Sequence, residues 1–152
     1  MNIFLGIFAV VIGTYFGYKF SYKYQYRLDF IRELSEFNKN LITNVSFTKN
    51  SIISMVEKLG RGNFNDYIKK YYDNNSFELE ERYFTSDEKD FINNYLLNIG
   101  TTDAISQLKS LQSYDEKIKE KLSNAESDNK KYKSLYVKLG FLFGLIVFIV
   151  LL

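Results

Sequence analysis

Residues 1–18 read MNIFLGIFAVVIGTYFGY and residues 139–152 read LGFLFGLIVFIVLL, and neither stretch contains a charged side chain. As helices rising about 1.5 Å per residue they would measure roughly 27 Å and 21 Å, against a hydrocarbon core of about 30 Å. Apolar residues before Lys138 can lengthen the second stretch, since the Lys138 ammonium group can reach up to the membrane surface. We therefore predict an N-terminal transmembrane helix at 1–18 and a C-terminal transmembrane or re-entrant segment at 139–152.

Each of these two segments has an alternative interpretation. The first could be a cleaved signal peptide, although it lacks a basic side chain at its start and a clear A-x-A site. The second could be the core helix of a soluble domain, although it is apolar on every face. We favour membrane segments over both alternatives.

The two segments share a spacing of small residues. Gly13 and Gly17 are four residues apart, as are Gly140 and Gly144, and Gly6 precedes Gly13 on nearly the same helix face. In lipid, helix pairs are stabilised by close approach of their backbones, which G-x-x-x-G permits. We predict that Gly13, Gly17, Gly140 and Gly144 are helix-packing residues, either on each other or on a different subunit. The alternative is that Gly is simply commoner in transmembrane helices.

Residues 19–138 are charged and periodic, and predict a helical soluble domain. Apolar side chains recur at helical spacing after the first segment: Phe20, Tyr24, Leu28, Ile31, Leu34, Leu41 and Val45, with Phe37 and Ile42 beside them. A second stripe leads into the last segment: Ile105, Leu108, Leu111, Ile118, Leu122, Ala125, Tyr132 and Tyr136. Because the chain has no Pro to interrupt a helix, each stripe predicts a long helix that continues into its membrane segment.

Capping residues predict shorter helices between the two long ones. Thr48 can cap a helix over 50–59, and Asn63 can cap one over 64–72. Residues 73–76 are expected to form a turn, and 77–84 are ambiguous between a short helix and a loop.

Thr85 and Glu88 match the T-x-x-E capping box of a further helix, which Gly100 ends. Thr101 or Thr102 then opens the final helix. The predicted fold class is all-α: a membrane-anchored helical bundle of two long antiparallel helices and three shorter ones.

Composition removes most catalytic chemistry. The chain has no His, Cys or Trp, and its net charge is +2, which gives no strong field for nucleic acid. Two carboxylate clusters, at 78–81 and 87–90, are interleaved with Lys and Arg and predict solvated faces or a favourable helix N-terminus. We therefore expect no enzymatic activity, no cofactor, no metal and no nucleic-acid partner.

Basic residues flank the two apolar segments on one side only. Lys19, Lys23 and Arg27 follow the first, whereas Lys130, Lys131, Lys133 and Lys138 precede the second. The positive-inside rule then places residues 19–138 in the cytoplasm. The basic run before the second segment is typical of a lipid-headgroup flank.

Two short motifs resemble those of the stage III sporulation protein AB family. The ending L-G-x-x-x-G-L-x-x-x-I-x-L occupies 139–151, and an upstream L-G-x-x-D-x-x-x-Q pattern is present with Ile99 in place of Leu, followed by Gly100, Asp103 and Gln107. The resemblance implies a subunit of the channel complex joining mother cell and forespore in endospore-forming bacteria, located in the mother-cell membrane around the forespore. It also implies a helical domain similar to those of type II secretion and type IV pilus inner-membrane platform proteins.

The function expected from these patterns is a non-catalytic scaffold of a membrane secretion or channel complex. Its expected partners are other membrane subunits and the lipid bilayer, with a cytoplasmic motor ATPase as a further candidate. Rival interpretations are a holin-like or pore-forming hairpin that assembles with itself, a generic membrane-tethered coiled-coil adaptor, and a membrane-tethered enzyme that uses carboxylates.

Overall fold

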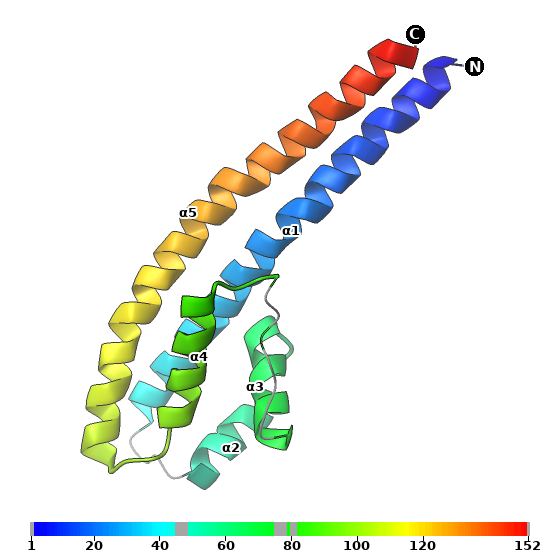
Figure 1. Ribbon diagram of the computed structural model, residues 1–152. Coiled ribbons are helices and arrows are strands. Elements are labelled where there is room, and N and C mark those ends of the chain that lie inside the picture. The colour runs from blue at the N-terminus through cyan, green and yellow to red at the C-terminus, as the bar shows by residue number, and fades with distance from the viewer. Residues whose placement is uncertain (1, 45–48, 75–78, 80–81, 152) are drawn as a thin grey trace. The chain divides into compact units, whose positions relative to one another are not determined.

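The computed structural model describes residues 2–44, 49–74, 79 and 82–151, which form five helices and, within those ranges, no strand (Figure 1). The helices are α1 (Asn2–Thr43), α2 (Lys49–Glu57), α3 (Asn63–Asn74), α4 (Ser86–Asn98) and α5 (Ala104–Leu151). The predicted all-α class, with two long terminal helices and three shorter ones, is confirmed.

The chain divides into two compact units, and both long helices contribute to each. The hairpin unit comprises residues 1–25 and 125–152, and the bundle unit comprises residues 26–124. In the hairpin unit the two chain ends lie beside each other, so α1 and α5 run antiparallel there (Figure 1). The division of the chain at residues 18 and 138 concerns the membrane boundary and stays a prediction.

The core of the bundle unit is built on one face of α1. Five of the residues predicted on this stripe are almost wholly buried: Leu28, Ile31, Leu34, Phe37 and Leu41. Phe30, which the predicted stripe omits, is also fully buried. The centroid of its ring lies 5.3 Å from that of Phe64 and 4.7 Å from that of Phe84. Residues from every other helix complete this core: Ile52, Phe64, Ile68, Tyr95, Leu111 and Ile118. Its apolar burial is the main source of stability in a unit of this kind.

The N-terminal ends of the helices use local and distant caps. The capping box of α4 is confirmed, since Thr85 Oγ1 accepts from the Glu88 backbone N–H and Glu88 accepts from that of Thr85. Thr101 and Thr102 were the wrong choice for α5, because the Asp103 carboxylate accepts the N–H groups of Ile105 and Ser106, both at 3.1 Å.

Helix α3 begins at Asn63, and its first backbone N–H groups donate hydrogen bonds to a side chain of another helix. Glu33 of α1 accepts the backbone N–H groups of Phe64 and Asn65, at 2.9 and 3.3 Å. The helix also runs on to Asn74, so the turn predicted from residue 73 begins too early. Of the ambiguous stretch 77–84, the described residues 79 and 82–84 are not helical.

Two members of the predicted apolar stripes are exposed within the protein. Phe20 is 64% exposed and Ile105 is 83% exposed, so neither belongs to the core. Ile105 lies in the first turn of α5 and Phe20 in the hairpin unit. Periodicity assigns a face to a helix, but it does not tell where along the helix the partner begins. The predicted stripe residue Val45 and the predicted cap Thr48 lie outside the described residues.

Candidate helix-packing site

The four predicted packing glycines lie where the backbones of α1 and α5 approach each other closely. A Cβ atom placed on Gly13 would lie 2.5 Å from the carbonyl oxygen of Gly140, and one on Gly144 would lie 2.6 Å from the Cα of Val10. Cβ atoms on Gly17 and Gly140 would likewise collide with the Tyr136 and Gly13 carbonyl oxygens. Since only hydrogen fits at these positions, α1 and α5 pack backbone against backbone.

The close contact extends in both directions along the hairpin. A Cβ on Gly6, about two turns before Gly13, would meet the Phe148 ring. At the other end, Ser21 is 1% exposed, and its hydroxyl donates to the Tyr18 carbonyl oxygen at 2.7 Å. Ser21 was missed by the sequence analysis, although it continues the four-residue spacing of Gly13 and Gly17 with another small residue.

An apolar groove lies on one face of the hairpin. It has a volume of about 960 Å³, and the glycine contact forms part of its lining. Aromatic residues from both helices line it as well: Phe8, Phe16, Phe20, Tyr136 and Phe143. Because the glycines hold the backbones together, larger side chains on either side leave this hollow between them.

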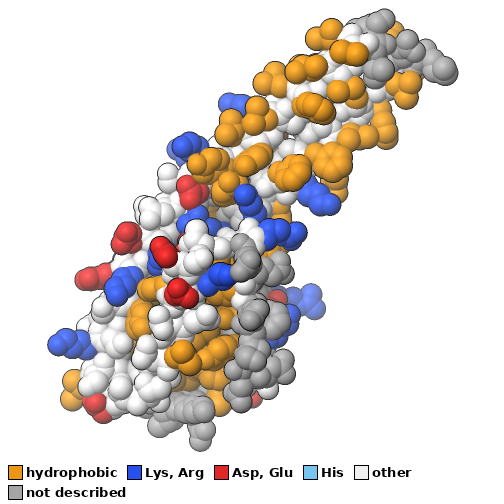
Figure 2. All heavy atoms as spheres, in the orientation of Figure 1, with side chains coloured by type: hydrophobic (Ala, Val, Ile, Leu, Met, Phe, Trp, Pro, Cys, Tyr) orange, Lys and Arg blue, Asp and Glu red, His pale blue; other side chains and the backbone are white. Residues whose placement is uncertain are grey.

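Most of the remaining hairpin surface is apolar and faces outward. The apolar windows of α1 and α5, each long enough to cross a membrane, are only 17% and 6% buried within the protein. Figure 2 shows apolar side chains spread over the visible face of the hairpin beyond its charged end. A core helix of a soluble domain would be mostly buried, so this exposure is typical of helices that contact lipid.

Polar and aromatic residues occupy the charged end of the hairpin. Gln25 Oε1 accepts from Asn129 Nδ2 at 3.2 Å and from the Lys133 ammonium group at 3.3 Å. The ring of Tyr24 stacks on that of Tyr132, with centroids 4.8 Å apart. Tyrosine is favoured at membrane–water interfaces because its ring is apolar and its hydroxyl is polar.

Glu88, which was predicted in the capping box of α4, is buried in the bundle unit. Glu88 pairs with Arg27, whose Nη2 lies 2.7 Å from Glu88 Oε1, and the Glu88 side chain is only 6% exposed. Asp87 and Asp90 are exposed, as expected. Glu88 therefore joins α1 to the N-terminus of α4. Of the other predicted cluster, Glu78, Glu80 and Glu81 lie outside the described residues.

The bundle unit also holds a buried polar chain. The Tyr95 hydroxyl donates to Asn38 Oδ1 at 3.1 Å, and Asn38 Nδ2 donates to the Leu111 carbonyl oxygen at 3.2 Å. Tyr95 and Asn38 are both fully buried. These bonds tie α1, α4 and α5 together. Among the described residues, no group of three or more carboxylates is placed to hold a metal ion.

The chain matches the model of a known protein family. The family described as stage III sporulation protein AB matches residues 68–152, more than half of the chain. The chain belongs to the stage III sporulation protein AB family. No curated protein matches it, and no solved structure does. The suggested likeness to secretion-platform domains therefore stays a prediction from resemblance.

The matched region contains the upstream motif of Ile99, Gly100, Asp103 and Gln107, one of the two that suggested the stage III sporulation protein AB family. Gly100 adopts a positive φ of 75°, which favours glycine, and ends α4. The Gln107 side chain, 2% exposed, accepts from the Gly100 backbone N–H at 3.0 Å. Asp103 caps α5 between them. The motif residues thus build the turn between α4 and α5.

Proposed function

We propose that this protein is a non-catalytic membrane subunit of the channel complex that joins mother cell and forespore during endospore formation. The observation that carries the proposal is the match to the stage III sporulation protein AB family, which includes the whole second apolar segment. Membership in the family supports a role at the third stage of sporulation. The channel itself, and the cytoplasmic side of residues 19–138, are the proposed parts.

The hairpin supports a scaffold that presents a preassembled pair of membrane helices. Its glycines hold α1 and α5 in close contact within one chain. The apolar groove remains, and we propose that it receives a transmembrane helix of another channel subunit. Phe16 and Phe143 offer large apolar surfaces from opposite helices for such a helix.

A pore-forming hairpin is less well supported. A pore lining needs polar groups that point away from their own helix. Thr14, a polar residue inside the first apolar segment, donates its hydroxyl to the Val10 carbonyl oxygen at 2.8 Å, one turn back in the same helix. The Thr14 hydroxyl is therefore bonded to the backbone of its own helix.

Deletion of the gene in the source organism tests the sporulation role. We expect normal vegetative growth, arrest at the third stage of sporulation and loss of heat-resistant spores, with rescue by a second copy of the gene. Normal spore counts in the deletion strain would rule out the proposed function.

A second experiment tests the groove. Phe16→Ala with Phe143→Ala should fail to rescue the deletion and should lose membrane partners on co-purification. The matched control is Phe4→Ala with Phe141→Ala, since both phenylalanines are exposed on the hairpin but do not line the groove. Equal rescue by the two double variants would exclude the groove as the binding surface.

A further inference from the structure

The hairpin unit carries a second hollow at its charged end. It has a volume of about 390 Å³ and is lined by six residues of α5: Asn129, Lys130, Lys133, Ser134, Val137 and Lys138. Three of the six residues are lysines and none is acidic, so the hollow favours an anion.

The position of this hollow fits the headgroup layer of a membrane. The charge-free segment begins at Leu139, so at about 1.5 Å per residue Lys138 and Lys133 lie roughly 2 Å and 9 Å before it. Each headgroup layer is about 5–8 Å thick. Lysine side chains can extend several ångströms along the helix, so both ammonium groups can reach the level of lipid phosphates.

Two of the lining side chains are fixed on the same neighbour. Lys133 donates to Gln25 Oε1, which holds its ammonium group beside α1, and an ammonium group has three donors, so others remain for a phosphate. Asn129 donates to the same oxygen at 3.2 Å.

We propose that this basic hollow binds the headgroup of an anionic phospholipid, with the phosphate on Lys133 and Lys138. Phosphatidylglycerol is a phospholipid of this class. The inference rests on insertion of the hairpin in a membrane and not on the sporulation role, so either can fail without the other.

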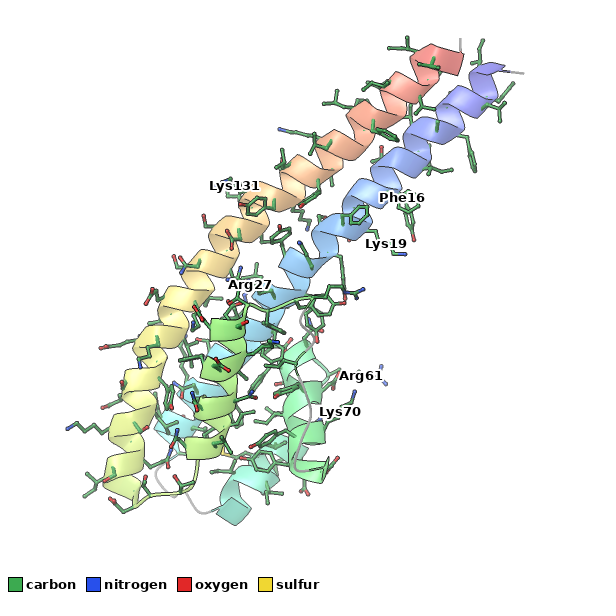
Figure 3. All side chains as sticks on the ribbon, viewed as in Figure 1. Phe16, Lys19, Arg27, Arg61, Lys70 and Lys131 are labelled. Carbon is green, nitrogen blue, oxygen red and sulfur yellow. The ribbon has the colours of Figure 1, made fainter. Side chains whose placement is uncertain are left out.

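The basic charge of the hairpin offers a matched control. Lys19 and Lys131 belong to the same unit but do not line the hollow, and Figure 3 shows them on the outer sides of α1 and α5. The Lys131 ammonium group lies 5.2 Å from the centroid of the Tyr132 ring. Removing these two charges lowers the general attraction to an anionic surface as much as removing Lys133 and Lys138.

The test is native mass spectrometry of the full-length protein released from bilayers of phosphatidylglycerol and phosphatidylcholine. We expect wild type to retain one phosphatidylglycerol, and Lys133→Gln with Lys138→Gln to lower this retention at least about tenfold. Lys19→Gln with Lys131→Gln should keep it within about twofold of wild type, and Lys133→Arg with Lys138→Arg should preserve it.

Three results would overturn the proposal. Equal losses in the two glutamine double variants would show general charge attraction only. Equal retention of phosphatidylcholine would show no selection for an anionic headgroup. Displacement of the lipid by millimolar inorganic phosphate would show a site for a free anion instead. Circular dichroism of each variant confirms that its helices are intact.

Discussion

Gly13 and Gly140 face each other across the hairpin, so that a Cβ atom on Gly13 would lie 2.5 Å from the Gly140 carbonyl oxygen. Ordinary contact with such an atom needs roughly 1 Å more. The pair therefore sets the distance between the two helices, and the other close glycine contacts repeat the arrangement along the interface. This is the geometry that small residues permit between helices in lipid.

Gly140→Leu should separate the two helices by several ångströms. The chain contains no Cys, so cysteines at the exposed positions Val11 and Ile146 can carry spin labels. Double electron–electron resonance would then measure the change in the distance between the two labels. Gly60→Leu is the control, because no atom lies within 4 Å of a Cβ placed on Gly60. An unchanged label distance in Gly140→Leu would contradict the close-packed hairpin.

Arg27→Ala should destabilise the bundle unit by about 3 kcal/mol, because it leaves the buried Glu88 carboxylate without its guanidinium partner. Urea unfolding followed by the near-ultraviolet circular dichroism of the tyrosines would measure the loss. Arg32→Ala is the matched control, since its pair with Asp29 is exposed and should contribute less than about 1 kcal/mol. Similar losses for the two variants would argue against a special role for the Arg27–Glu88 pair.

The stability of the bundle unit should decline at alkaline pH. Burial raises the pKa of Tyr67 to about 12 and raises the pKa of Tyr95 well above 10. The folded state therefore favours the neutral phenols, and this stability is complete below about pH 10 and is lost as the pH rises through about 12.

Tyr67→Phe isolates one of these phenols. The variant should lose less stability than wild type between about pH 10 and 12, by up to about 2 kcal/mol in the free energy of unfolding. Tyr22→Phe, which removes an exposed tyrosine of the hairpin unit, should follow the wild-type curve. Parallel pH curves for wild type and Tyr67→Phe would show that ionisation of Tyr67 is not coupled to unfolding.

Residues 19–138 should face the cytoplasm, because seven Lys and Arg residues crowd their two membrane flanks. A cysteine at the exposed position Asn93 should resist an impermeant maleimide in intact cells and react after lysis. A cysteine added after Leu152 should react in intact cells if the second segment spans the membrane fully. Labelling of Asn93→Cys before lysis would show that residues 19–138 face the outside of the cell.

Features that depend on neighbouring residues were predictable from the sequence. The Thr85–Glu88 capping box and the end of α4 at Gly100 each depend on a few neighbouring residues, and the structure contains both. The apolar stripe of α1 is also correct from Leu28 to Leu41, because helical spacing determines which side chains share a face. The choice of Thr101 or Thr102 was wrong because the neighbouring Asp103 is of a residue type that caps helices at least as well.

Features that join distant parts of the chain were not predictable in this way. The Arg27–Glu88 pair links residues 61 positions apart, and the bonds from Glu33 to the α3 N-terminus link positions 31 and 32 apart. Local sequence shows only that each carboxylate has cationic and polar neighbours. Likewise, the glycine spacing indicated that each apolar helix packs closely on something, but a pattern within one helix does not identify the partner.

The contacts between Gly13 and Gly140 have a consequence for the order of assembly. Two helices tethered in one chain meet at an effective concentration of about millimolar or above, which a helix from another molecule must exceed to compete. The hairpin should therefore close before any second subunit arrives. A free peptide of residues 1–18 should compete poorly with α1 for pairing with α5. Each copy would then join a larger assembly as a single two-helix element, with its internal pairing already decided.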